Sequence, residues 1–154
     1  MRISYLTPHP TRHEFYREGI KFYLRRIRQL WPAFEYSEMG PIRTSNPQQA
    51  IAEEERLLTK RLKQGDHVVI LDERGELFTT RALARQWEQW LHQRIRRLIF
   101  VSGGPYGFSE SFREKSHAVI ALSPMTLSHE MTRLVLLEQL YRVITLWKGL
   151  PYHH

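Results

Sequence analysis

The segment RRLIFVSGGPYGFSESF, residues 96–112, holds the clearest information on the architecture of this 154-residue chain. It begins with an apolar run that is typical of a parallel strand buried on both faces. Glycines follow, and then the stretch FSESFREKSH (108–117), which favours a short helix. A strand, a glycine turn and a helix in this order form the repeating unit of α/β proteins. Glycines at such a turn also let a ligand come close to the backbone.

The same alternation of strand and helix runs along the whole chain. Apolar runs predict strands at 2–7, 34–39, 66–73, 96–103 and 118–123. Apolar residues three and four apart predict helices at 13–31, 48–65, 79–94, 108–117 and 128–147. We expect Gly65 to cap the second helix and RGE (74–76) to form a tight turn. The pattern predicts a single domain, residues 1–154, with a parallel sheet covered on both faces.

Composition narrows the class of protein. Apolar residues make up 42% of the chain, which is enough for a core, and there is no cysteine for a disulfide or a thiolate zinc site. The start MRISYLTPHP has no signal-peptide core, and polar residues interrupt the longest apolar stretch (134–147). We therefore expect a cytoplasmic protein with no membrane span and no metal. A net charge of +7 favours a polyanionic partner such as nucleic acid, although a merely basic surface is the alternative.

The glycine turn does not match the common nucleotide motifs. The pattern Ser102-x-Gly104-x-x-Gly107 has the spacing of the dinucleotide fingerprint but lacks its first glycine, and the next strand does not end near an acid that could bind a ribose. No Gly-Lys-Ser/Thr follows, which excludes a P-loop. An ordinary tight turn without a ligand remains the alternative on this evidence.

Two further strand ends are expected beside the glycine turn. In a parallel sheet, ligands bind beyond the carboxyl ends of the strands, here residues 71–73, 102–105 and 122–127. The last of these is apolar and contains a proline, where a solvent loop should be polar. The second and third loops contain no Lys or Arg, so they suit a flat ring such as adenine better than a polyphosphate.

Four segments, in order, resemble a known family: LDERG (71–75), SGGPYGFS (102–109), LSPMTLSHEMTRLVLLEQLYR (122–142) and the terminal PYHH (151–154). They are similar to the RlmH family, small SPOUT-class methyltransferases that act on large-subunit ribosomal RNA. The early segment FYLRR (22–26) fits as well. The resemblance implies an α/β knot, a C-terminal trefoil through which the last segment threads, and a working homodimer. It also implies S-adenosylmethionine as cofactor and, as substrate, N3 of a pseudouridine in 23S rRNA of the assembled ribosome.

The resemblance also implies which residues bind the cofactor. Carried over position by position, these are Leu71, Gly103, Leu122, Ser123, Pro124, Met125, Thr126 and Leu127. This chain departs from the usual family pattern at Tyr106, where an acidic residue is frequent, and at Pro124-Met125.

Candidate catalytic residues lie near the C-terminus. N3 of the target base carries a proton, so a base should assist methyl transfer. We expect His153 to be that base and Tyr152 to position the nucleotide, unless PYHH only docks on the dimer. His129 is expected to be structural, because a helix start disfavours its charged form. Arg142 is either an rRNA phosphate contact or the ion-pair partner of Glu138, and the family makes an active-site role plausible from the opposite subunit.

Two surface features bear on partners. Arginines cluster at 25–28 and 94–97, which indicates either rRNA backbone contacts or solvated surface. The last helix is apolar nearly all round, so a second copy of the chain is expected to cover part of it. The alternatives to a methyltransferase are a non-catalytic rRNA-binding assembly factor and, more distantly, a nucleotide-binding oxidoreductase.

Overall fold

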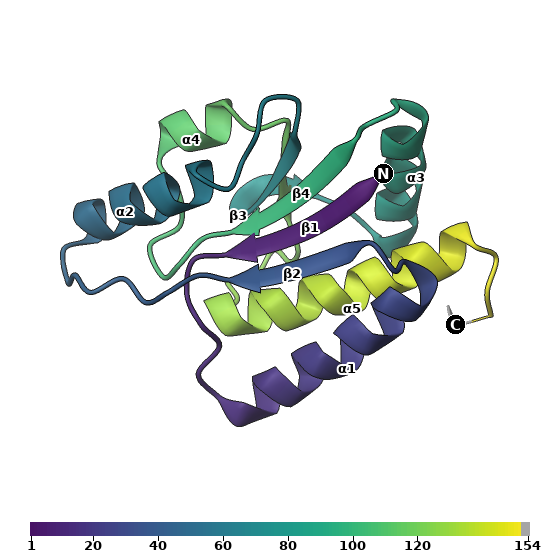
Figure 1. Cartoon of the computed structure of the whole chain (residues 1–154), viewed down its shortest axis with the longest axis horizontal. Helices are drawn as coiled ribbons and strands as arrows, with labels where there is room; N and C mark the ends of the chain where they lie inside the picture. The colour runs from purple at the N-terminus through teal and green to yellow at the C-terminus, as the bar shows by residue number, and fades with distance from the viewer. Residues whose placement is uncertain (152–154) are drawn as a thin grey trace.

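The computed structural model describes residues 1–151, and within them five parallel strands form one sheet in the order β2-β1-β4-β3-β5 (Figure 1). The strands are β1 Arg2–Thr7, β2 Phe34–Glu38, β3 His67–Leu77, β4 Arg97–Ser102 and β5 Ala118–Ala121. The helices are α1 Glu14–Leu30, α2 Pro47–Thr59, α3 Thr80–His92, α4 Glu110–Glu114 and α5 His129–Trp147. The predicted parallel α/β architecture is confirmed.

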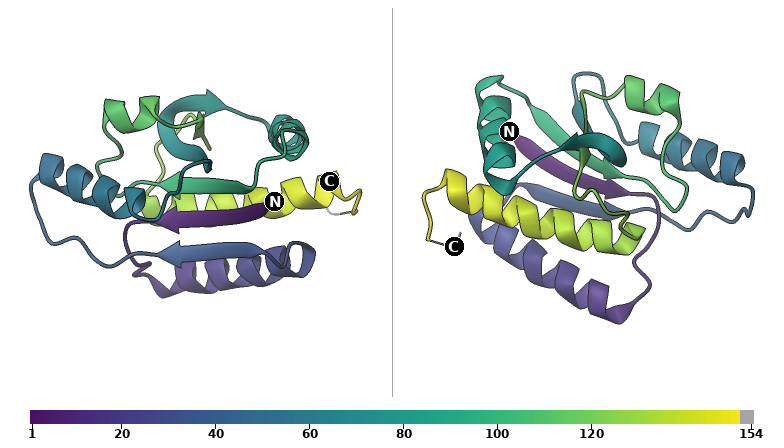
Figure 2. Two further views of the ribbon diagram at one scale, coloured as in Figure 1. Left: turned by 45° about the horizontal axis from the view of Figure 1, so that its top comes forward. Right: turned by 180° about the vertical axis from the view of Figure 1, so that it is seen from behind.

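Helices cover both faces of the sheet. Helices α1, α3 and α5 lie on one face and α2 and α4 on the other (Figures 1 and 2). Successive residues of β4 point to opposite faces: Phe100 packs in the cluster of α1, α3 and α5, and Val101 packs in the cluster of α2 and α4. Two buried faces explain why this strand has an unbroken apolar sequence.

Helix α5 lies between α1 and α3, which explains its apolar residues on several sides. Gly19 of α1 allows a close approach, because a Cβ there would lie 2.8 Å from Leu134 Cδ1. Trp87 of α3 is fully buried in the same layer. Among residues 1–151, no helix is both long and apolar enough to cross a membrane.

The expected turn at residues 74–76 was wrong. Strand β3 continues through Gly75 to Leu77, and both Leu71 and Glu76 pair with Ile120 of β5 across an irregularity in the ladder. Gly75 is there for close packing: a Cβ would lie 2.6 Å from the backbone N and C of Ile120. A glycine between charged residues is a turn signal in sequence, whereas here it marks the close approach of two backbones.

The expected extent of the second helix was also wrong. Helix α2 ends at Thr59, and Lys60, not Gly65, is its C-cap residue. The side chain of Asp66 accepts a hydrogen bond from the Lys63 N–H at 2.6 Å, and this local turn competes with helix continuation. Gly65 has a φ of +86° and serves the turn that leads into β3.

Candidate functional site

A cavity of about 470 Å³ opens beyond the carboxyl ends of β4 and β5, beside residues 71–74 in the middle of β3. The loops after β4 and β5 form two of its walls, as expected for this edge of a parallel sheet, but the third wall is part of a strand because β3 runs on to Leu77. Of the eight expected cofactor residues, seven line it: Leu71, Gly103, Leu122, Ser123, Met125, Thr126 and Leu127. Pro124 is exposed on the same loop and is not part of the wall. The volume falls in the range of small-molecule sites.

The glycine turn forms the wall at the end of β4. Gly107 has a φ of +70°, and its N–H donates to the carbonyl oxygen of Gly104 at 3.2 Å. A Cβ at Gly103 would lie 3.2 Å from both the Gly107 carbonyl oxygen and the Phe108 ring. The turn is therefore tight, and its glycines let the backbone form part of the cavity wall.

Two neighbouring carboxylates of α2 hold this turn in place. Glu54, whose side chain is 1% exposed, accepts the Gly104 N–H at 3.0 Å and contacts the His9 ring nitrogen Nε2 at 2.7 Å. Glu55 accepts the N–H and the hydroxyl of Ser109 at 2.7 and 3.0 Å. Buried charged groups need such partners. Sequence reasoning missed both residues, because their contacts span about fifty positions and leave no local pattern.

The wall formed by residues 71–74 of β3 carries charged side chains. Asp72 Oδ2 lies 3.6 Å from an Arg113 nitrogen, and Asp72 Oδ1 accepts the Arg74 N–H at 2.9 Å. Glu73 accepts the hydroxyl of Thr126 at 2.9 Å, which ties this wall to the 122–127 loop. The polar groups of this wall are therefore mostly engaged.

The first turn of α5 completes the cavity. Ser128 caps the helix by accepting the Met131 N–H at 3.2 Å, and His129 lines the cavity. Burial lowers the pKa of His129, and the charges of Arg133, His9 and Arg12 lower it further, while Glu130 opposes them. A lowered pKa leaves the imidazole neutral at pH 7. The structure therefore places this histidine in the site, where the sequence suggested only a structural position.

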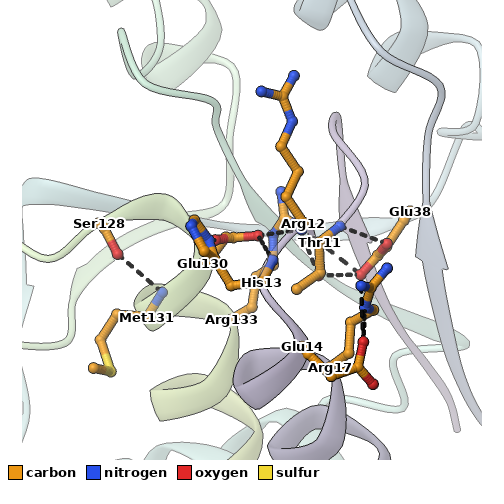
Figure 3. A network of polar contacts seen from close by, with 10 residues as sticks. All are labelled: Thr11, Arg12, His13, Glu14, Arg17, Glu38, Ser128, Glu130, Met131 and Arg133. Carbon is orange, nitrogen blue, oxygen red and sulfur yellow. Dashed lines mark hydrogen bonds and ion pairs between the residues drawn. The ribbon is translucent and has the colours of Figure 1, made fainter.

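Below the cavity, α5 is fastened to the segment that follows β1 (Figure 3). The buried carboxylate of Glu130 accepts hydrogen bonds from the Arg12 and His13 N–H groups and contacts the His13 ring. Burial alone would raise the pKa of Glu130, but these hydrogen bonds hold it at about 2. Arg133 is fully buried, donates to Thr11 Oγ1 at 2.9 Å and lies 3.8 Å from Glu38 Oε1.

The expected catalytic residues are not brought together within the described part of the chain. Tyr152 and His153 lie outside residues 1–151. Arg142 lies roughly 20 Å along α5 from His129, at a rise of about 1.5 Å per residue. It forms an ion pair with Glu138, which was one of the two expected roles.

The basic clusters are partly engaged inside the protein. Arg97 pairs with Asp66 at 3.1 Å, and the Arg26 guanidinium lies 4.6 Å from the centre of the Tyr141 ring. Arg25, Arg94 and Arg96 are exposed. Within residues 1–151 there is no group of three or more His, Asp or Glu residues arranged to hold a metal ion.

Comparison with known proteins gives the family. The model described as "Predicted SPOUT methyltransferase" matches residues 1–153. The chain belongs to the SPOUT methyltransferase family. The relatives of this SPOUT protein include two proteins named Ribosomal RNA large subunit methyltransferase H. The one from Cytophaga hutchinsonii is 37% identical over 156 residues, covering 100% of both chains. The one from Geobacter sp. strain M21 is 40% identical over 157 residues, covering 100% of this chain and 99% of the relative.

Proposed function

We propose that this SPOUT protein transfers a methyl group from S-adenosylmethionine to N3 of a pseudouridine in 23S rRNA, acting on the assembled ribosome in the cytoplasm. The observation that carries the proposal is the cavity wall. Seven of the eight residues expected to bind the cofactor converge there from strand β3 and from the loops after β4 and β5. The rRNA substrate is supported by relatives named as large-subunit rRNA methyltransferases over the full chain.

The residues present fit this cofactor. The cavity combines the half-buried Leu122 and Leu127, which suit the adenine ring, with a glycine turn whose backbone can hydrogen-bond it. A side chain at Gly103 would crowd that turn. Asp72 and Glu73 bring negative charge to the wall formed by β3, which suits a cationic sulfonium. Bound there, S-adenosylmethionine would supply an electrophilic methyl group, and the protein would hold the target nitrogen in line with it and exclude water.

We further propose that residues 1–154 form a single domain. Its C-terminal half is knotted. Strand β5 is at the edge of the sheet, yet α5, which follows it, packs centrally between α1 and α3. The connection 122–128 lines the same cavity as residues 71–74 of β3 and the loop after β4. This path supports threading of the last segment behind those loops, as the family resemblance implies.

We propose a homodimer as the working form. Phe15 and Phe22 of α1 are 62% and 42% exposed, and the half-buried Met131 and Val135 of α5 lie on the same layer of helices. We expect size-exclusion chromatography with light scattering at micromolar concentration to give twice the chain mass. A mass of one chain at that concentration would contradict the dimer.

We also propose that His153, Tyr152 and Arg142 contact the target nucleotide, with Arg142 coming from the partner subunit because its own cavity is too far away. His153→Ala is expected to keep cofactor binding within a factor of about two and to lower methyl transfer about 100-fold or more. Binding is measured by titration with S-adenosylmethionine and transfer by labelled methyl incorporation. Unchanged turnover would remove His153 from the reaction.

The function itself is tested by incorporation of labelled methyl groups from S-adenosylmethionine into ribosomes that lack this modification. We expect one methyl per ribosome, located at N3 of one pseudouridine, and little incorporation into protein-free rRNA. Exposed arginines such as Arg25 and Arg96 should make ribosome binding weaken as salt rises. Salt-sensitive ribosome binding without any methyl transfer would instead identify a non-catalytic assembly factor.

A further inference from the structure

In the proposed reaction, on which this inference rests, the target nitrogen loses a proton whose acceptor has to be identified. The lone pair of the target nitrogen attacks the methyl carbon, so an N–C bond forms. The C–S bond breaks, and its electrons stay on sulfur to give a neutral thioether. The proton of the nitrogen must pass to a base, because the neutral N–H form is a poor nucleophile. The sequence suggested His153, but the cavity itself contains a candidate.

Most titratable groups of the cavity wall are already engaged. Asp72 accepts the Arg74 N–H and pairs with Arg113, and Glu73 accepts the Thr126 hydroxyl. Tyr106 is exposed at the rim and Arg74 is a cation, so neither suits a proton acceptor at neutral pH. His129 also lines the cavity, and within residues 1–151 its ring makes no hydrogen bond. An unengaged imidazole is the group in this wall best suited to accept a proton.

The surroundings of His129 favour its neutral form, which is the form that can accept a proton. The side chain is half-buried, which disfavours its cationic form. The positive charges of Arg133 on its own helix, and of His9 and Arg12 in the segment after β1, act in the same direction. Arg74 in the cavity wall is a further positive charge nearby. Glu130, Asp72 and Glu73 act in the opposite direction, but each carboxylate is shared with other partners. The His9 ring, held by Glu54, lies 6.3 Å from the His129 ring, centre to centre.

We propose that His129 is a catalytic residue that accepts the proton of the target nitrogen, while His153 contacts the base without taking this proton. The charge of the cavity is then conserved through the step: a sulfonium with a neutral imidazole becomes a thioether with an imidazolium. Conserving charge in a partly buried site avoids the cost of creating a new one.

The pH dependence of kcat/KM for methyl transfer to ribosomes distinguishes the two histidines. Wild type should lose activity on the acidic side as the base becomes protonated. His129→Gln, which keeps a polar side chain that does not titrate, should be about 100-fold slower at pH 7 and lack this acidic limb. His153→Ala should be slower at every pH and keep the limb. An acidic limb that persists in His129→Gln, or disappears in His153→Ala, would overturn the proposal.

A second measurement does not depend on turnover. In an NMR titration of the histidine ring nitrogens, His129 should titrate below the ordinary value of about 6.5. Its midpoint should be lower still with S-adenosylmethionine than with S-adenosylhomocysteine, because only the former carries a sulfonium. Equal midpoints with the two ligands would place His129 away from the methyl group and contradict the proposal. Failure of wild type to bind either ligand would instead count against the proposed function.

Discussion

Gly75→Ala is expected to lower the free energy of unfolding by about 3 kcal/mol, at the upper end of the range for overpacking. The new Cβ would lie 2.6 Å from the backbone N and C of Ile120, and backbone atoms cannot rotate away as a side-chain tip can. Pairing of β3 with β5 on both sides of the contact would be disturbed. Urea unfolding followed by circular dichroism measures the loss.

The same substitution should weaken cofactor binding at least tenfold, since Leu71, Arg74, Ile120 and Leu122 line the cavity on either side of the contact. Gly40→Ala is the matched control, because a Cβ there meets nothing within 4 Å. The control should change stability by less than about 0.5 kcal/mol. Equal stability of the two variants would show that β3 and β5 do not approach each other as described.

Glu130→Gln is expected to cost about 2 kcal/mol of stability at neutral pH, as is usual for hydrogen bonds to a buried charged group. The variant weakens the acceptor that binds the Arg12 and His13 N–H groups and the His13 ring. Glu18→Gln removes an exposed ion pair with Lys21 and is the control, with an expected change below about 1 kcal/mol. Urea unfolding at pH 7 compares the three proteins.

The stability that Glu130 provides should depend on pH. Because its pKa is lowered from 4.5 to about 2 in the folded protein, its contribution is present above pH 4.5 and is lost as the pH falls towards 2. Unfolding measured between pH 5 and pH 2 should show the difference between wild type and Glu130→Gln shrinking through this window. A difference that stays constant down to pH 2 would mean that the carboxylate is not the source of the effect.

Local patterns were sufficient to predict the sheet and the place of the cavity. Apolar runs and helical stripes depend on neighbours in sequence, and the carboxyl ends of parallel strands must share one edge. Gly103 and Leu122 therefore meet as expected, while Leu71 joins them from within β3; the family resemblance names all three individually. The ion pair of Arg142 with Glu138, four residues apart on one helix, was foreseeable for the same local reason.

Long-range contacts were beyond the sequence patterns. The glycine at position 75 signals a turn unless the neighbouring strand is known, and only the β5 backbone shows why it is needed. Glu54 meets Gly104, and Glu130 meets His13, across distances in sequence that no periodicity encodes. The helix dipole alone indicates a structural role for His129, whereas its place in the cavity wall depends on β3 and on the loops after β4 and β5.

The central claim is that the cavity between the middle of β3 and the ends of β4 and β5 binds S-adenosylmethionine, and equilibrium dialysis with the labelled cofactor tests it most directly. The protein is measured alone and with equimolar ribosomes, with NAD as competitor. We predict one bound S-adenosylmethionine per chain, with binding undisturbed by excess NAD and at least tenfold weaker in Gly75→Ala. Displacement by NAD, or no binding either alone or with ribosomes, would contradict the account.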